Sequence, residues 1–417
     1  MTAYLLEKAW VDGTVRDTVR VEVDDGVITR VEPDADRTGI PLRGLTLPGF
    51  ANTHSHVFHR ALRGRAQRGS GTFWTWREQM YDVAARLDPE RLHALARATY
   101  AEMVAAGYTS VSEFHYVHHQ PDGTPYDDPN ELGHALVAAA AAAGIRLTLI
   151  DTCYLAGGIG EPLAPAQLRF GDGDAERWAE RVAALRHDRV GGAIHSVRAV
   201  PREQMTTVVA ASGGRPLHVH VSEQPAENEA CLAAYGLTPV GLLADAGALG
   251  PRTTAVHATH LTADDITLLA SSDTEVSLCP TTERDLGDGI GPARALADAG
   301  VRLSVGSDSQ AVIDPFEEVR AVEMDERLAS TARGRFGAAD LLARTAGRIA
   351  VGEPADLVTI DLTSPRTAGT GGDEHTAVFA ATAADVTHVV AAGRPVFDGD
   401  HGRVGRELGA AIDRLWT

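Results

Sequence analysis

The stretch Pro48-Gly-Phe-Ala-Asn-Thr-His-Ser-His56 ends an apolar run in two histidines two positions apart. Side chains two apart in an extended segment point to the same face, so His54 and His56 are expected side by side at a strand end. Two neutral imidazoles so placed can bind one divalent metal ion and leave its other positions open. Because His-x-His alone is a weak signal, the prediction depends on ligands at the ends of other strands.

The middle of the chain alternates short β-branched strands with segments of helical periodicity. Strands are expected at residues 109–117, 146–154, 192–200, 216–223, 253–261, 275–282 and 302–308. Helical segments include residues 89–106, 176–186, 227–246 and 263–271. With the strand that carries His54, this pattern predicts a (β/α)8 barrel, an α/β fold. A doubly wound open sheet is the alternative, but no Gly-x-Gly-x-x-Gly follows a strand.

Both ends of the chain have a different pattern. Residues 1–45 alternate apolar and polar side chains, and Asp25-Gly26 between two such runs is typical of a hairpin. Residues 352–361 and 386–397 repeat this style. The two termini are therefore expected to form antiparallel strands of one small β domain.

Composition excludes several classes of protein. The chain has 417 residues and a formal net charge of −19, which argues against nucleic acid or an anionic membrane as the main partner. Its three cysteines, Cys153, Cys231 and Cys279, are widely spaced and indicate a reducing compartment. The N-terminus lacks the features of a signal peptide, so a cytoplasmic location is expected. The apolar run at residues 135–144 indicates a buried helix, not a membrane span.

The fifth predicted strand, Leu217-His-Val-His-Val-Ser-Glu223, offers further ligands. Its two histidines share the inward face, and His220 lies nearer the C-terminal end, where barrel active sites are built. His218 is expected one layer deeper, in the barrel core. Glu223 follows just off the strand, where it could act as an acid and base above the metal.

The sixth and eighth predicted strands also end in polar residues, Ala255-Val-His-Ala-Thr-His260 and Ser304-Val-Gly-Ser-Asp-Ser309. We favour His257 over His260 because His257 lies within its strand. Asp308 can bind the metal and accept a proton from a water molecule. One such residue could be a hydrogen-bonded structural group, but four strand ends of this kind together indicate a site.

These motifs resemble the amidohydrolase superfamily. The resemblance implies a distorted (β/α)8 TIM barrel at residues 48–352 and a small β-sandwich formed by residues 1–47 and 353–417. Many binuclear members bridge two metals with a carboxylated lysine, whereas Lys8, the one lysine here, belongs to the terminal β region. The pair His220 and Glu223 instead follows the pattern of the mononuclear deaminases.

Three longer stretches resemble the formimidoylglutamate deiminase branch of histidine degradation. They are Thr72-Phe-Trp-Thr-Trp-Arg-Glu-Gln-Met-Tyr81, Gly107-Tyr-Thr-Ser-Val-Ser-Glu-Phe-His-Tyr-Val-His-His119 and Cys279-Pro-Thr-Thr-Glu-Arg-Asp-Leu-Gly-Asp-Gly-Ile290. This branch hydrolyses N-formimidoyl-L-glutamate to N-formyl-L-glutamate and ammonia. The resemblance implies one divalent metal ion per chain, most suitably Zn²⁺, a dicarboxylate formimino substrate and a homodimer.

The resemblance also assigns roles to residues. The implied metal ligands are His54, His56, His220 and Asp308. His257 and Asp308 would orient the water and take its proton, and Glu223 would carry protons to the departing nitrogen. The implied substrate-binding residues are Arg77, Tyr116, His195 and Arg198. His118 and His119 are expected to be solvated loop histidines, not ligands.

The chain departs from the family pattern in two places. The family commonly has Ala-Phe-Gln-Arg where this chain has Val57-Phe-His-Arg60, so His59 would replace a glutamine as donor to the substrate. After Arg335 the chain lacks an Ala/Gly-rich helical stretch found in relatives. A deaminase of a guanidino acid, another formimino acid or a nucleobase stays open as an alternative. A non-catalytic scaffold is disfavoured because every metal and acid/base position is filled.

Overall fold

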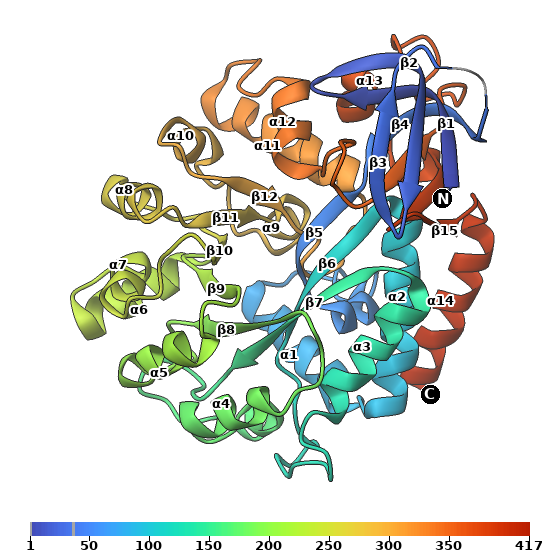
Figure 1. Ribbon diagram of the computed structural model, residues 1–417. Helices are drawn as coiled ribbons and strands as arrows, with labels where there is room; N and C mark the ends of the chain where they lie inside the picture. The colour runs from blue at the N-terminus through green and yellow to red at the C-terminus, as the bar shows by residue number, and fades with distance from the viewer. Residues whose placement is uncertain (1, 36–37) are drawn as a thin grey trace.

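The structure, a computed structural model, describes residues 2–35 and 38–417. Eight parallel strands follow one another around a barrel in the order β12-β11-β10-β9-β8-β7-β6-β5 (Figure 1). Their bounds are β5 Phe50–Ser55, β6 Tyr108–His115, β7 Arg146–Cys153, β8 Val190–Ser196, β9 Leu217–Val221, β10 Thr253–His257, β11 Glu275–Leu278 and β12 Leu303–Val305. A bridge between Ser55 and Asp308 brings the two end strands together. The predicted fold class is thereby confirmed.

Helices cover the outside of the barrel. They are α1 Phe73–Ala85, α2 Pro89–Ala106, α3 Glu131–Ala143, α4 Ala175–Ala183, α5 Arg202–Ser212, α6 Pro225–Tyr235, α7 Pro239–Asp245, α8 Ala263–Ser271, α9 Pro280–Leu286, α10 Ala293–Asp298, α11 Pro315–Ser330 and α12 Ala338–Thr345, with 3₁₀ turns at Val57–Leu62 and Pro165–Phe170. The prediction of a single helix at residues 227–246 is wrong, because two helices, α6 and α7, occupy this segment. Gly236 ends α6 in a left-handed conformation, and Pro239 starts α7.

The termini form a second sheet in the order β15-β14-β13-β4-β1-β2-β3. Its strands are β1 Thr2–Val11, β2 Thr14–Asp24, β3 Val27–Glu32, β4 Ile40–Pro48, β13 Leu357–Ile360, β14 Val386–Ala391 and β15 Arg394–Phe397. The pair β4 and β13 joins the N-terminal and C-terminal segments. One pair, β1 with β4, is parallel, where antiparallel strands were expected throughout. The boundaries of the two domains remain a prediction.

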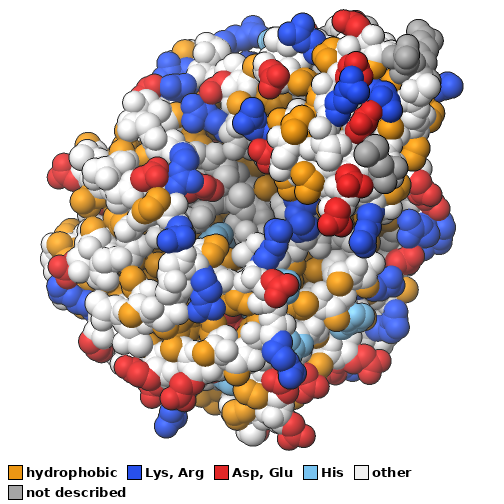
Figure 2. Space-filling model, viewed as in Figure 1, with side chains coloured by type: hydrophobic (Ala, Val, Ile, Leu, Met, Phe, Trp, Pro, Cys, Tyr) orange, Lys and Arg blue, Asp and Glu red, His pale blue; other side chains and the backbone are white. Residues whose placement is uncertain are grey.

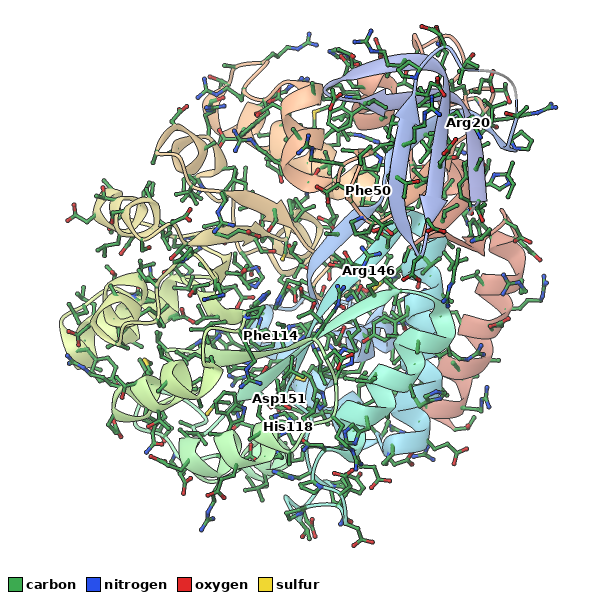
Figure 3. The ribbon with its side chains drawn as sticks, in the orientation of Figure 1. Arg20, Phe50, Phe114, His118, Arg146 and Asp151 are labelled. Carbon is green, nitrogen blue, oxygen red and sulfur yellow. The ribbon has the colours of Figure 1, made fainter. Side chains whose placement is uncertain are left out.

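Several contacts fix this terminal sheet to the barrel. Strand β4 runs almost directly into β5, so the ligand-bearing strand begins at the junction. Arg146 of β7, labelled in Figure 3, donates to both carboxylate oxygens of Asp356. Thr109 of β6 donates to the same carboxylate. The last helix, α14 His401–Trp416, lies along α2, while α13 Glu374–Phe379 and the turn Ala383–Asp385 lie between β13 and β14 in the chain.

The chain after Arg335 takes a short route. Helix α12 ends at Thr345, and the backbone nitrogen of Gly347 donates to the carbonyl oxygen of Gly49 at 3.0 Å. The chain then enters β13 at Leu357. The segment that follows the last helix of the barrel is therefore hydrogen-bonded to the start of β5.

The surface fits the acidic composition. Figure 2 shows arginine and acidic side chains interspersed over the viewed face. None of the helices in the described part of the chain has both the length and the apolar character needed to span a membrane.

Candidate metal centre and active site

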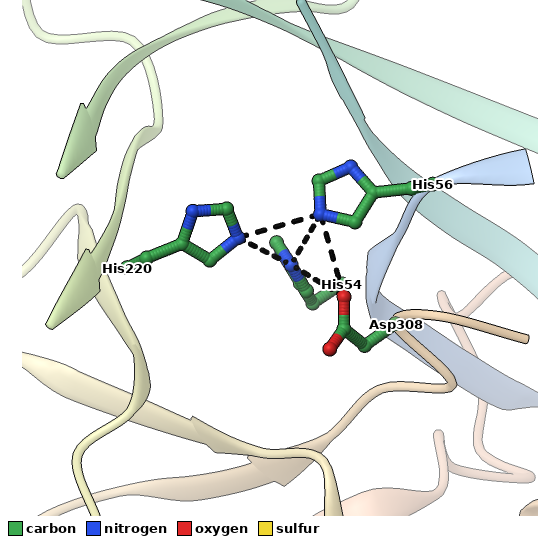
Figure 4. A group of neighbouring side chains, drawn as sticks. All are labelled: His54, His56, His220 and Asp308. Carbon is green, nitrogen blue, oxygen red and sulfur yellow. Dashed lines mark hydrogen bonds and ion pairs between the residues drawn. The ribbon is translucent and has the colours of Figure 1, made fainter. Parts of the chain in front are cut away.

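Four potential ligand atoms converge at the C-terminal ends of three barrel strands (Figure 4). His54 lies near the end of β5 and His56 directly follows it, while His220 lies on β9 and Asp308 follows β12. All four side chains are buried. The Nε2 atoms of the three histidines lie 3.0 to 3.3 Å apart. Asp308 Oδ1 lies 3.3 Å from Nε2 of both His54 and His56.

Hydrogen bonds set which ring nitrogens face the centre. His56 Nδ1 lies 2.9 Å from the carbonyl oxygen of Phe114, and His220 Nδ1 lies 2.9 Å from that of His195. Because a carbonyl only accepts, each Nδ1 carries the proton and each Nε2 turns a lone pair toward the centre. Burial lowers the pKa of His54, His56 and His220, which keeps these rings neutral.

This arrangement fits a divalent metal ion. Lone pairs that face one another at these distances repel unless a cation lies between them. A tetrahedral ion with nitrogen bonds of about 2.0–2.1 Å holds its ligand atoms roughly 3.3 Å apart, close to the observed spacing. Burial acts to raise the pKa of Asp308, but the contact with His54 and the positive charge of His257 outweigh it and hold that pKa well below its usual range.

The backbone locks Asp308 against the ligand strand. Asp308 has a left-handed φ of 40°, which is uncommon for this residue type. Its nitrogen donates to the carbonyl oxygen of His54 at 3.0 Å, and its carbonyl oxygen accepts from the nitrogen of His56 at 3.1 Å. The carboxylate is therefore held in register with both histidines of β5.

Two groups suited to proton transfer lie beside the four ligand atoms. His257 Nε2 lies 3.7 Å from Glu223 Oε1 and 3.8 Å from Asp308 Oδ2. On its other side, His257 Nδ1 lies 3.4 Å from Glu283 Oε1. Burial acts to lower the pKa of His257, but the three carboxylates raise it to about 10. His260, the competing histidine, instead lies 2.8 Å from the carbonyl oxygen of Asp288.

A pocket of about 530 Å³, including its open mouth, leads to these residues. Helix α1 forms one wall, and the ends of β6, β7 and β8 form another. The pocket is lined by the predicted substrate-binding residues Arg77, Tyr116, His195, Arg198 and His59, and by Phe73, Trp76, Met80, Tyr81, Tyr154 and Leu286. Cationic and aromatic side chains therefore surround the approach to Glu223.

His59 lies in this wall as a neutral imidazole. Its Nε2 is 2.9 Å from the hydroxyl of Tyr116, while no described residue partners its buried Nδ1. Burial lowers the pKa of His59 to about 3. The ring therefore offers one unpaired nitrogen as a polar group.

Comparison with known proteins places the chain in a family. Residues 45–396 match the amidohydrolase family, which is most of the chain. The chain belongs to the amidohydrolase family. This amidohydrolase is 38% identical to formimidoylglutamate deiminase of Pseudomonas aeruginosa, over 100% of this chain and 99% of that protein. The resemblance expected from the sequence is confirmed.

Other relatives are named for different substrates. The amidohydrolase is 30% identical to 8-oxoguanine deaminase of Pseudomonas aeruginosa, over 78% of this chain and 76% of that protein. It is 29% identical to 5-methylthioadenosine/S-adenosylhomocysteine deaminase of Halobacterium salinarum, over 92% of this chain and 89% of that protein. The alignment with formimidoylglutamate deiminase spans 449 positions, so that enzyme has residues that this 417-residue chain lacks.

Solved structures have the same fold. An amidohydrolase from Brucella melitensis superposes with a TM-score of 0.90 and 31% identity, over 100% of both chains. An adenosine deaminase from Xanthomonas campestris with bound zinc superposes with a TM-score of 0.84 and 24% identity, over 100% of this chain and 98% of that chain.

The expectation that His118 and His119 are solvated is wrong. Both are buried, and His119 Nε2 lies 3.1 Å from Asp172. His115, His118 and Asp151 of this amidohydrolase also lie close enough to share an ion (Figure 3 labels two of them). However, the guanidinium of Arg181 donates to both oxygens of Asp151 at 2.8 and 2.9 Å, so a cation already occupies that carboxylate. These residues form a structural network between helix α4 and the strands β6 and β7.

Sequence reasoning missed part of the pocket. Phe73, Trp76, Met80 and Tyr81 recur on one face of α1, at a spacing that could have identified this wall. Tyr154, at the end of β7, has no comparable signal. Glu227 and Glu283 were also missed, because their contacts with Arg198 and His257 join residues that are distant in sequence.

Proposed function

We propose that this amidohydrolase is a mononuclear, metal-dependent deaminase that hydrolyses N-formimidoyl-L-glutamate to N-formyl-L-glutamate and ammonia in histidine degradation. The observation that carries this proposal is one pocket in which Arg77 and Arg198 accompany Glu223 and three of the four potential metal ligands, His56, His220 and Asp308. Full-length identity to formimidoylglutamate deiminase supports the same substrate. A cytoplasmic location and a homodimer remain predictions.

The metal centre would hold one divalent ion. His54, His56, His220 and Asp308 supply three imidazole nitrogens and one carboxylate oxygen, a donor set that suits Zn²⁺ and also accepts Fe²⁺ or Mn²⁺. When bound, such an ion supplies Lewis-acid activation of a water molecule near neutral pH.

The surrounding residues would move the protons. Asp308 Oδ2 and His257 Nε2 would orient the water that attacks the formimidoyl carbon, and Asp308 would take its proton. Glu223 would deliver one proton to the terminal nitrogen as water adds, and the proton held by Asp308 would supply the second. Glu223 would recover a proton from the new hydroxyl group as the C–N bond breaks, so that ammonia leaves and both carboxyl groups return to their starting states. Burial raises the pKa of Glu223, the direction that favours its proton-carrying form.

The two arginines would hold the substrate carboxylates. A guanidinium binds a carboxylate through two parallel hydrogen bonds, and such pairs are strong in a buried site. Tyr116, His195 and His59 would add neutral hydrogen-bonding groups along the wall. A neutral nucleobase would offer no carboxylate to the pocket-facing guanidinium groups of Arg77 and Arg198, so the pocket favours a dicarboxylate over the purines named for other relatives.

The test is to measure ammonia and N-formyl-L-glutamate released from N-formimidoyl-L-glutamate by the metal-loaded protein. Glu223→Gln is the control, and we expect its kcat to fall by roughly 10²–10⁴-fold with metal content unchanged. No turnover by a wild-type protein that contains one metal ion per chain would contradict the proposed substrate. Equal turnover by both proteins would contradict the role of Glu223.

A further inference from the structure

Glu227 is a buried carboxylate next to the active site that the proposed reaction does not use. It lies on α6, four residues after Glu223, and its side chain is 0% exposed. Glu227 Oε2 accepts from Arg198 Nε at 2.6 Å, and its Oε1 accepts from the backbone nitrogen of Ser222 at 2.8 Å. Each oxygen therefore has its own donor.

The first contact orients Arg198. A guanidinium is planar, so a carboxylate bound at Nε fixes the plane in which the terminal nitrogens lie. Arg198 lines the pocket, and its Cζ lies 5.9 Å from the ring centre of Phe73. With Nε held by Glu227, the terminal nitrogens are left for a carboxylate in the pocket.

The same contact separates two groups of opposite charge. Arg198 Nη2 lies 3.8 Å from Glu223 Oε2, longer than a hydrogen bond. Without Glu227, the guanidinium would have Glu223 as its nearest buried carboxylate. Arg198 would then turn toward Glu223 and away from the substrate.

The second contact supports the turn that presents Glu223. Ser222 has a left-handed φ of 53°, which is rare for serine and needs support from its surroundings. Glu227 supplies this support through the Ser222 nitrogen. One buried carboxylate therefore connects the turn before Glu223 to the guanidinium of Arg198.

We infer that Glu227 is a positioning residue that sets Arg198 to bind one substrate carboxylate. The inference rests on the proposed function, because it requires a substrate that carries carboxylates. It assigns to Glu227 an effect on substrate affinity that a residue needed only for folding would not have.

Glu227→Gln is the decisive variant because it keeps the size of the side chain and removes one acceptor. A carboxylate can accept from Ser222 and Arg198 together, whereas an amide has a single oxygen. We expect the KM for N-formimidoyl-L-glutamate to rise roughly 10- to 100-fold, as for the loss of a hydrogen bond to a charged group. Glu229→Gln, an exposed position on the same helix, is the matched control and should leave KM unchanged.

Two comparisons separate positioning from a general structural defect. In an Arg198→Gln background, Glu227→Gln should cause no further rise in KM, because the residue acts through Arg198. The effect of Glu227→Gln on turnover should also differ between a substrate that lacks the α-carboxylate and one that lacks the γ-carboxylate. The one missing the carboxylate that Arg198 holds should be turned over equally by wild type and Glu227→Gln. An additive loss, or an equal loss with every substrate, would overturn the inference.

The position of the Arg198 guanidinium is a second readout that needs no turnover. In a crystal structure of Glu227→Gln, the Arg198 guanidinium should lie closer to Glu223 than it does in a crystal structure of the wild type. A guanidinium in the same place in both structures would overturn the inference. If Glu227→Gln does not fold, Glu227→Asp, which keeps the charge but shortens the reach, takes its place. A wild type inactive on N-formimidoyl-L-glutamate would refute the proposed function, while the position of Arg198 in the variant would still decide the role of Glu227.

Discussion

His218 and His220 show how two residues on one strand can have different tasks. Both point into the barrel from β9, but only His220 reaches the other three potential ligands. His218 is buried deeper, where burial lowers its pKa to about 3, and no described residue partners its Nδ1. Position along the strand, more than residue type, decides which histidine can bind metal.

This difference predicts the metal content of two variants. His220→Ala removes one of four ligands, so bound metal should fall from about one ion per chain to less than a tenth of that after dialysis, measured by plasma mass spectrometry. His218→Gln is the matched control and should keep its metal. Metal retained by His220→Ala, or lost equally from both, would contradict the assigned centre.

At this scale, the sequence predicts residues whose role depends on local spacing. The two-residue period of a strand brings His54 next to His56 and favours His220 over His218. Glu227 and Glu283 could not be found in this way. Glu227 contacts Arg198 and Glu283 contacts His257, and these contacts arise only when separate β/α units pack together.

At the scale of elements, the junction of β12 with β5 keeps the ligand set together. Gly306 follows β12 and lies against the backbone of His54. A Cβ at position 306 would lie 2.6 Å from the carbonyl oxygen of His54 and 2.8 Å from its nitrogen. No side chain larger than hydrogen fits unless the two segments move apart.

Gly306→Ala should therefore weaken metal binding by displacing Asp308 from His54 and His56. We expect metal affinity to fall at least tenfold, within the range for residues that orient metal ligands, measured by competition with a chelator. Gly409→Ala on the exposed face of α14 is the control, because no described atom outside that helix would lie within 4 Å of the new Cβ. Unchanged affinity in Gly306→Ala would show that the junction tolerates the added atom.

Helix α4 is attached to the barrel by the buried Arg181, which binds Asp172 as well as Asp151. Burial acts to raise the pKa of Asp172, but His119 and Arg181 outweigh it and hold that pKa far below its usual range. The unfolded chain therefore binds the proton more readily than the folded chain. This stabilisation is present above the unfolded pKa of about 4 and is lost as the pH falls below it.

Asp172→Asn should lower the free energy of unfolding at pH 7 by about 3 kcal/mol, because it removes one partner from a buried ion pair. Below about pH 4 the gap between wild type and variant should narrow by about 1.4 kcal/mol per pH unit. Urea unfolding of both proteins across this range measures the gap. A gap that stays constant with pH would contradict the ionised state of Asp172.

Some elements could not be predicted from local pattern alone. The long helical segment at residues 227–246 has suitable periodicity, but Gly236 and Pro239 divide it into α6 and α7. The parallel pairing of β1 with β4 is also invisible in the sequence, because alternating apolar residues specify a strand and not its partner. The eight barrel strands were predictable because each is short, apolar and followed by a helical segment.

At the scale of the whole molecule, Asp356 fastens the terminal sheet to the barrel. Its carboxylate accepts from Arg146 and Thr109 of the barrel and from the backbone nitrogen of Ala392. These contacts lie at the opposite end of the barrel strands from the ligand residues. The terminal sheet therefore supports the start of β5 without lining the pocket.

Asp356→Asn should consequently reduce stability and spare catalysis. We expect the free energy of unfolding to fall by about 2 kcal/mol through loss of a charged hydrogen-bond acceptor, with KM unchanged. Asp17→Asn removes an exposed ion pair with Lys8 in the same sheet and should have no measurable effect on unfolding. A rise in KM for Asp356→Asn would show that the sheet and the active site are coupled.

Substrate choice belongs to the whole molecule, because residues of α1 and α9 and residues at the ends of β5 to β10 and β12 line the pocket. The most direct test is to compare kcat/KM for N-formimidoyl-L-glutamate, 8-oxoguanine and S-adenosylhomocysteine on one zinc-loaded preparation. A site built for two carboxylates should favour N-formimidoyl-L-glutamate by about 10⁴-fold or more, because neither purine compound can place two carboxylates against Arg77 and Arg198. Deamination of either purine with equal or higher efficiency would contradict the proposed function.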